Sequence, residues 1–181
     1  MRVFIAGPRT ISVLDAPVGE RLNNIYTKNY TVLVGDAGGV DSAVQKYFSD
    51  LGYGNVVVFA SEGKARNNIG RWEVRGIDVP ARSKGFSYYT AKDKAMAEHT
   101  DYGFMIWNGE SKGTLNNIIN LVNLGKSSIV YLTIMKTFYS IEDIDSLQEL
   151  LALCGQSTRL LFERLSKSLS MPSVHKQISL F

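Results

Sequence analysis

The chain has 181 residues, of which 45% are hydrophobic and 20% charged, so it is long enough for one domain with a full hydrophobic core. Its net charge of +3 suits an anionic ligand, but the basic residues form no long stripe of the kind that holds nucleic acid. No apolar run approaches the ~20 residues that span a bilayer. We therefore expect neither direct nucleic-acid binding nor a membrane segment.

Cysteine and histidine content bears on the compartment and on metal sites. Cys154 is the single cysteine, so no internal disulfide can form, and the Cys and His spacing matches no metal-binding pattern. His99 and His175 are far apart in the sequence. The first ten residues contain an apolar run of only four, which is too short for a signal peptide. These features predict a cytoplasmic protein without a resident metal ion.

Apolar runs of strand length recur along the chain. They are continuous rather than alternating, which is typical of parallel strands covered by helices on both faces. The predicted strands cover residues 3–6, 31–34, 55–59, 102–107 and 128–132.

Helical patterns separate these strands. Asp15 can cap the first helix, which has Pro17 in its first turn, and Gly125 can end the fourth. The predicted helices cover residues 15–27, 41–51, 90–99 and 112–124. Strands that alternate with helices predict a Rossmann-like α/β fold, a doubly wound parallel sheet with helices on both faces.

Two segments depart from this alternation. Residues 61–87 carry six basic side chains without a clear period, and we interpret them as an insertion with a short hairpin over 72–79. After residue 132, two leucine-rich helices over 141–153 and 157–169 are expected to pack on the domain or on another subunit of a homo-oligomer. The predicted organisation is a Rossmann-like domain over 1–135, a helical extension over 136–170 and a flexible tail over 171–181.

The first candidate site follows the second predicted strand and opens the next helix. Its candidate ligand-binding residues are Gly35, Asp36, Gly38, Gly39 and Asp41. Free N–H groups at a helix N-terminus attract phosphate, and glycine lets a ligand approach the backbone. Asp36 fits a ribose hydroxyl or a Mg²⁺ ion that accompanies a nucleotide, and equally a surface turn. The alternative for the whole loop is a tight turn with Asp41 as the helix cap.

Two more loops follow predicted strands. In one, Arg9 can bind a phosphate bidentately or remain a solvated surface residue. In the other, Ser111 or Thr114 can cap a helix while Lys112 offers a charge to an anion. Ligands of open α/β sheets bind at the carboxyl ends of the strands, so these loops are expected to meet there. The candidate residues are Gly7, Arg9, Asn108, Gly109, Ser111, Lys112, Gly113 and Thr114.

These loops resemble the nucleotide-binding motifs of the SLOG superfamily, in particular its YspA/YpsA-related branch. Gly-Pro-Arg at 7–9 is similar to the glycine-x-arginine opening, residues 32–48 to the glycine-rich loop and its helix, and residues 89–121 to the second half. The resemblance covers residues 1–132. It implies a Rossmann-like fold that binds or senses a nucleotide or nucleotide-derived phosphate ligand, without by itself implying an enzyme.

An enzyme that acts on nucleotides or nucleosides is the alternative function. Similar enzymes use a glutamate shortly after the glycine–threonine pair to act on the N-glycosidic bond. Here that stretch contains Asn116 and Asn117, and an amide cannot serve as a carboxylate nucleophile or base. Asp93 and Glu98 remain as candidate catalytic residues, although Asp93 also fits a capping box with Thr90.

The last five residues, Gln-Ile-Ser-Leu-Phe, resemble the short peptide by which bacterial proteins bind the DNA sliding clamp. Leu180 and Phe181 suit a hydrophobic groove, and Gln177 can hydrogen-bond a neighbouring pocket. The resemblance implies the clamp as a partner. The alternative is a tail whose apolar side chains pack back on the domain.

Overall fold

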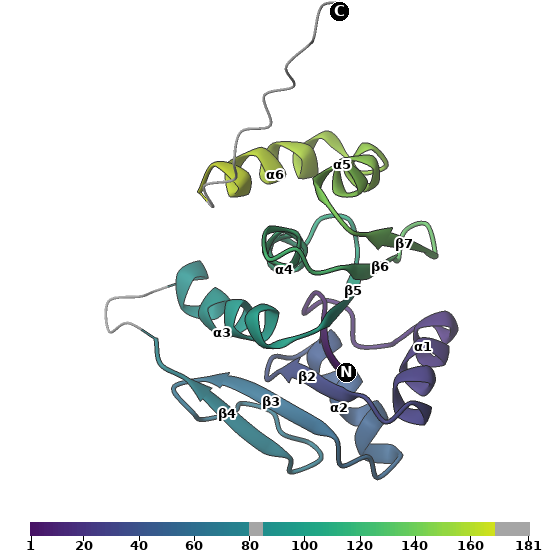
Figure 1. The fold of residues 1–181 in the computed structure, drawn as a ribbon, viewed down its shortest axis with the longest axis vertical. Coiled ribbons are helices and arrows are strands. Elements are labelled where there is room, and N and C mark those ends of the chain that lie inside the picture. Colours follow the sequence, from purple (N-terminus) through teal and green to yellow (C-terminus); the bar gives the residue numbers. More distant parts are fainter. Residues whose placement is uncertain (80–84, 169–181) are drawn as a thin grey trace, which may run out of the picture.

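The computed structural model describes residues 1–79 and 85–168. At its centre lies a seven-stranded sheet in the order β4-β3-β2-β1-β5-β6-β7, whose neighbouring strands are all parallel except β6 and β7 (Figure 1). The strands are β1 (Arg2–Ala6), β2 (Thr31–Gly35), β3 (Val56–Ser61), β4 (Glu73–Ile77), β5 (Tyr102–Trp107), β6 (Ser128–Leu132) and β7 (Thr137–Ile141).

Helices cover both faces of this sheet and form two separate cores. The helices are α1 (Ala16–Thr27), α2 (Val40–Asp50), α3 (Phe86–His99), α4 (Lys112–Asn123), α5 (Ile144–Ala152) and α6 (Gln156–Ser168). Side chains of α1 and α2 share one buried cluster, and side chains of α3 to α6 share the other. Among the last four, α6 contacts α4 and α5 contacts β7.

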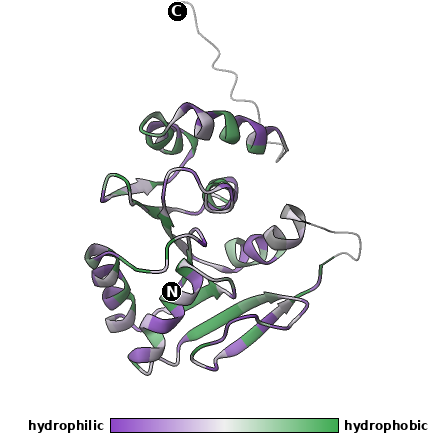
Figure 2. Ribbon diagram, turned by 180° about the vertical axis from the view of Figure 1, so that it is seen from behind, coloured by the Kyte–Doolittle hydropathy of each residue, from purple (hydrophilic) through white to green (hydrophobic). Residues whose placement is uncertain are grey.

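Strand β1 shows why the predicted strands are apolar throughout. Phe4 and Ala6 belong to the core beneath α3 and α4, whereas Val3 and Ile5 belong to the core beneath α1 and α2. Successive side chains of a strand point to opposite faces, so a strand that is covered on both sides has no polar positions. Figure 2 shows the corresponding concentration of hydrophobic residues along the strands. The Rossmann-like fold with a helical C-terminal part is therefore confirmed.

The structure corrects several predicted elements. The hairpin expected over 72–79 is instead the edge strand β4, which pairs in parallel with β3. The helix expected from residue 141 begins at Ile144, because the residues before it form β7 antiparallel to β6. The helix expected from Thr90 begins at Phe86, so Thr90 is not its N-cap and the proposed capping box with Asp93 is not formed.

The strand order positions the candidate site. The chain builds outward from β1 to β2, β3 and β4 on one side, and then returns to add β5 and β6 on the other. The connections on the two sides of β1 run over opposite faces of the sheet, which leaves a crevice beyond the carboxyl ends of β1 and β5. Among the described residues, no helix is long and apolar enough to cross a membrane.

Candidate functional site

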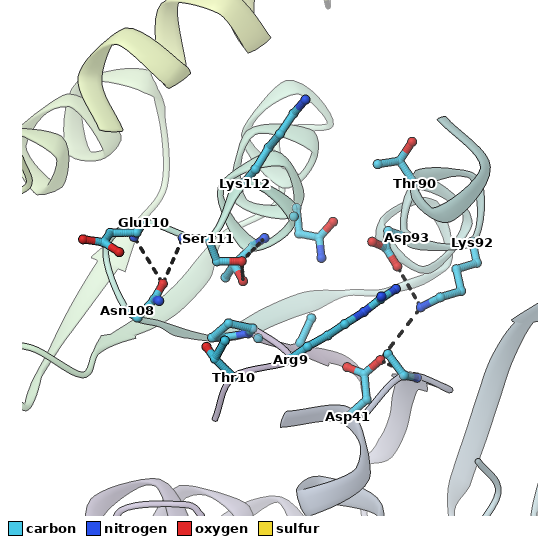
Figure 3. A pocket seen from close by; sticks show the side chains of 17 residues that line it. Arg9, Thr10, Asp41, Thr90, Lys92, Asp93, Asn108, Glu110, Ser111 and Lys112 are labelled. Carbon is cyan, nitrogen blue, oxygen red and sulfur yellow. Dashed lines mark hydrogen bonds and ion pairs between the residues drawn. The ribbon is translucent and has the colours of Figure 1, made fainter. Parts of the chain in front are cut away.

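A cavity of about 480 Å³ lies at the carboxyl ends of β1 and β5 (Figure 3). The predicted ligand-binding residues that line it are Gly7, Arg9, Asp41, Asn108, Ser111, Lys112, Gly113 and Thr114, and the candidate catalytic residue Asp93 lines it too. The other lining residues include Thr10, Thr90, Lys92, Glu110 and Asn117. The loops after β1 and β5 thus meet across one cavity, with the side chains of α3 on its far wall.

The loop after β5 presents the N-terminus of α4 to this cavity. Asn108 Oδ1 accepts hydrogen bonds from the backbone N–H of Glu110 and of Ser111, at 3.2 and 2.9 Å. Ser111 is the N-cap of α4, and its hydroxyl accepts from the backbone N–H of Thr114. A Cβ built on Gly113 would meet no other part of the protein within 4 Å, so the backbone of the first helical turn borders open space. The positive end of a helix dipole at such a position attracts an anion.

The C-terminal helices hold this loop in place. Gly109 has a positive φ of 79°, a conformation that suits glycine, and it lies behind the cavity wall rather than in it. Its carbonyl accepts a 2.6 Å hydrogen bond from the hydroxyl of Thr158, a buried residue of α6. The helical part at the C-terminus therefore fastens the loop that carries Ser111.

The loop after β2 has a different role from the one its sequence indicates. Asp41 turns back to the N-terminus of α2, where its Oδ2 accepts a 3.1 Å hydrogen bond from the backbone N–H of Ala37. Gly39 has a φ of 73°, and a Cβ there would collide with the backbone of Arg9. Gly38 is exposed and lies outside the cavity lining. The loop is therefore a tight turn, but Asp41 is not the helix cap that the alternative predicted: the N-cap of α2 is Gly39, and Asp41 lies in the first helical turn. The glycine at 39 lets the Arg9 loop pack closely.

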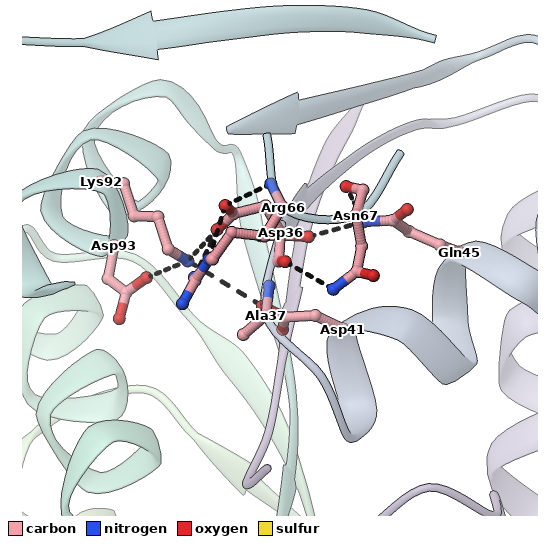
Figure 4. A network of polar contacts seen from close by, with 9 residues as sticks. Asp36, Ala37, Asp41, Gln45, Arg66, Asn67, Lys92 and Asp93 are labelled. Carbon is pink, nitrogen blue, oxygen red and sulfur yellow. Dashed lines mark hydrogen bonds and ion pairs between the residues drawn. The ribbon is translucent and has the colours of Figure 1, made fainter. Parts of the chain in front are cut away.

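A buried charge network forms part of the cavity wall and extends behind it (Figure 4). Lys92 on α3 is 3.0 Å from Asp93, 3.8 Å from Asp36 and 3.9 Å from Asp41, measured from its Nζ to the nearest carboxylate oxygen. Asp36 also accepts hydrogen bonds from the guanidinium of Arg66 at 2.7 and 2.9 Å. These contacts draw Asp36 away from the cavity, and a Cβ on Gly35 would collide with Asp41 and Lys92.

The network shifts the pKa of its members. Burial lowers the pKa of Lys92, but Asp93, Asp41 and Asp36 outweigh this effect and the net pKa lies above its usual value. Burial raises the pKa of Asp41, and the attraction of Lys92 offsets this only in part. Burial also acts to raise the pKa of Asp36, yet the hydrogen bonds from Arg66 leave it below its usual value. Lys92 is therefore a firmly charged centre that holds three carboxylates together.

The remaining predicted residues lie elsewhere. Glu98 is on the exposed side of α3, 3.9 Å from Lys94, and does not line the cavity. Gln177, Leu180 and Phe181 fall outside the described residues, as does the whole tail. Within residues 1–79 and 85–168, no three His, Cys, Asp or Glu side chains are placed to hold a metal ion.

Sequence reasoning missed several lining residues, of which Lys92 and Asn117 are the most deeply buried polar ones. Lys92 had no local signal, because its partners Asp36 and Asp41 lie about fifty positions earlier in the chain. Asn117 did have a local signal. It sits in a stretch of α4 over residues 114–121 that is buried throughout, where a polar side chain needs a partner.

Comparisons with known proteins support the fold class. No family model matches the chain, and no curated protein matches it. Among solved structures, the chain is similar to DNA processing protein A from Helicobacter pylori, which was described for its single-stranded DNA binding mode. The match has a TM-score of 0.58 at 12% sequence identity and covers 93% of this chain and 81% of that one. At this identity the similarity shows a shared fold.

This comparison corrects one expectation. We expected no direct contact with nucleic acid, because the basic residues form no stripe along the sequence. A protein with the same fold is nevertheless a single-stranded DNA binder, so the absence of a stripe does not exclude a nucleic-acid partner. Basic residues that are scattered in the sequence can come together at the carboxyl edge of a parallel sheet. The distribution of charge along the sequence does not reveal such a cluster.

Proposed function

We propose that the protein binds or senses a nucleotide-type ligand through its phosphate, in the cavity beyond β1 and β5, as a SLOG-type domain. The observation that carries this proposal is that Arg9 and the first turn of α4 line the same cavity. Its volume of about 480 Å³ lies within the ~300–1,000 Å³ that is usual for small-molecule sites.

Each lining group has a distinct role in this proposal. The N-terminal turn of α4, bordered by Ser111 and Gly113, provides backbone N–H groups and the positive helix end. Arg9 extends across the cavity toward α3 (Figure 3) and supplies a planar cation suited to phosphate oxygens. Lys112 extends from the rim on a flexible stem and adds a point charge.

The enzymatic alternative is supported less well. Asp93 lines the cavity, but its Oδ1 accepts a 3.0 Å hydrogen bond from Lys92, so it is engaged in the buried network. Asp41 accepts from the backbone N–H of Ala37 in the loop that precedes α2. Glu98 lies outside the cavity. A ligand-binding or sensing role uses these groups as they are arranged, whereas glycosidic chemistry needs a carboxylate presented to the substrate.

Single-stranded nucleic acid is a second candidate ligand. The fold it shares with a single-stranded DNA-binding protein favours it, and so does the charge along this edge. A smaller cavity of about 210 Å³ adjoins the first and is lined by Lys64, Arg66 and Tyr88. Lys92 in the wall of the first cavity lies 3.8 Å from Asp36 in the wall of the second. Together the two cavities offer cations and an aromatic ring to a longer chain.

Equilibrium binding separates the two candidates. Nucleoside mono- and diphosphates are expected to raise the melting temperature of the whole protein. At a ligand concentration of 100 times Kd, binding raises the free energy of unfolding by ~2.7 kcal/mol. An oligothymidylate that binds more tightly than any mononucleotide, with affinity falling steeply as salt rises, supports the second candidate. If neither a nucleotide panel at millimolar concentration nor the oligonucleotide binds, both are wrong.

Recruitment to the DNA sliding clamp is a separate proposal that rests on the sequence of residues 177–181. Replacing Leu180 and Phe181 with alanine is expected to abolish binding of the full chain to purified bacterial clamp, because these side chains are the apolar anchors. The melting temperature of the protein should not change. A wild-type chain that shows no clamp binding in surface plasmon resonance contradicts the proposal.

A further inference from the structure

A separate cavity lies at the amino ends of β1, β5 and β6, at the opposite end of the sheet from the candidate site. It opens on the face of the sheet that α1 and α2 cover, and of these two helices only α1 contributes lining residues. The other four helices belong to the core on the opposite face. The volume of the cavity is about 210 Å³, below the ~300–1,000 Å³ of sites for larger ligands, so it suits a ligand of one ring system.

The floor of this cavity is apolar and aromatic. Val3, Phe104 and Ile129 contribute to it from β1, β5 and β6. Tyr30 and Tyr102 line it beside them and are half-buried, so part of their surface is open to solvent. Aromatic rings pack favourably on other rings in offset or edge-on arrangements, and this floor therefore suits a planar aromatic group.

A cation without an acidic partner borders this floor. Arg21 lines the cavity from α1, and its guanidinium carbon lies 4.9 Å from the centre of the Phe138 ring. Among the described residues Arg21 forms no ion pair, and no Asp or Glu lines the cavity. Its charge acts on another lining residue, because burial raises the pKa of Tyr102 and Arg21 partly offsets this rise. Glu142, which lies outside the lining, acts in the same direction as burial.

Lys28 adds a second positive charge to the lining, about two helical turns beyond Arg21. It is the C-cap of α1, and its Nζ lies 5.9 Å from the centre of the Tyr30 ring. The helix dipole favours a cation at a C-terminus whether or not a ligand binds, so Lys28 alone says little about a ligand. Arg21 lies in the middle of α1, where the dipole does not explain its charge. A guanidinium stacked on a ring keeps its N–H donors at the edge, where they match the two oxygens of a carboxylate.

We propose that this cavity is a second binding site, for a small aromatic carboxylate whose ring packs on the floor and whose carboxylate pairs with Arg21. Tyr30 and Tyr102 contact the ring in this arrangement, and Arg21 selects for the negative charge. A neutral ligand of the same shape would gain the packing but not the ion pair. The site is distinct from the nucleotide cavity, and ligands bind the two ends of the sheet independently.

Nuclear magnetic resonance titration of the ¹⁵N-labelled full chain with paired ligands tests the proposal. The probes are benzoate and indole-3-carboxylate, with benzamide and indole-3-carboxamide as their neutral counterparts. Wild type is expected to bind the carboxylates about tenfold more tightly than the carboxamides, as one charge-assisted hydrogen-bonded pair provides. Shifted amide signals should map to the amino ends of β1, β5 and β6. Arg21→Gln should lower affinity for the carboxylates about tenfold and leave affinity for the carboxamides unchanged.

A cavity-filling variant tests the floor independently of the charge. Ile129→Trp on β6 is expected to occupy the space of the ligand ring and to abolish binding of carboxylates and carboxamides alike. Melting temperatures of both variants, compared with wild type, show whether they remain folded.

Two further variants serve as controls. Lys46→Gln removes an exposed cation of α2 that pairs only with Asp50 in the described structure, and it should preserve the tenfold preference. Gly113→Val alters the nucleotide cavity and should leave binding of the aromatic carboxylates unchanged. Absence of binding at millimolar concentration, a preference that survives Arg21→Gln, equal affinity for the charged and neutral probes, or shifted signals confined to the loops after β1 and β5 would overturn the second site. None of these results bears on the nucleotide cavity.

Discussion

Replacing Lys92 with methionine is expected to lower the free energy of unfolding by about 3–5 kcal/mol, which is the usual cost of removing one member of a buried ion pair. The Lys92 side chain is only 6% exposed, and three carboxylates lie within 3.9 Å of its Nζ. Methionine fills a similar volume without the charge, so the loss isolates the electrostatic role. Urea denaturation monitored by circular dichroism measures it.

The pH dependence of this variant follows from the carboxylates that lose their cation. Burial already raises the pKa of Asp41, and without Lys92 its folded-state pKa rises further. A carboxyl whose folded pKa lies above its unfolded value destabilises the protein at higher pH, and this penalty disappears as pH falls toward about 4. The difference in stability between wild type and Lys92→Met is therefore expected to be smaller near pH 5 than near pH 7.

Lys94 provides the matched control on the same helix. Its side chain is 71% exposed and forms only a surface pair with Glu98 at 3.9 Å. Lys94→Met should change the free energy of unfolding by less than about 1 kcal/mol, because exposed pairs contribute little. Equal effects of the two substitutions, or a Lys92→Met penalty that does not depend on pH, would show that the buried network is not what holds α3 against the loop after β2.

Replacing Gly113 with valine is expected to weaken nucleotide binding about 10- to 100-fold, since forcing extra methyl groups into a filled site typically costs ~1–3 kcal/mol. A Cβ added at this position meets no other part of the protein within 4 Å, so we expect the variant to fold. Its side chain would instead occupy the space where a phosphate approaches the first turn of α4. Titration calorimetry of wild type and variant with the same nucleotide gives the ratio of the two dissociation constants.

Gly38 offers the corresponding control. A side chain there also meets no atom within 4 Å, but Gly38 is exposed and does not line the cavity. The sequence predicted Gly38 as a ligand-binding residue alongside Gly113, whereas the structure leads us to expect wild-type affinity for Gly38→Val. Loss of binding in Gly38→Val, with binding intact in Gly113→Val, would move the phosphate site to the loop after β2.

The sequence predicts the strands of the sheet unevenly. Strands buried on both faces, such as β1, leave a continuous apolar run, so these strands and the helices that cover them could be predicted, although the order of the strands in the sheet could not. Strands β4 and β7 are mostly half-exposed and leave no such run. Their place in the sheet depends on pairing with β3 and β6, which local residue patterns do not encode.

At the site, the same limit applies to residues that act through distant partners. The loop before Thr114 could be predicted because strand, turn and helix cap follow one another in the sequence. Asp36 could not be placed correctly, because its position is determined by Arg66 and Lys92, thirty or more residues away. Asn117 lines the cavity although it is not among the predicted ligand-binding residues, because its place beside Gly113 and Arg9 appears only once the chain is folded.

A crystal structure of the protein with a bound ribonucleoside 5′-monophosphate tests the central proposal most directly. We expect the phosphate to contact the first turn of α4 and the guanidinium of Arg9, within the cavity beyond β1 and β5. A phosphate bound instead between Lys64 and Arg66, with the larger cavity empty of ligand, would contradict the proposed site.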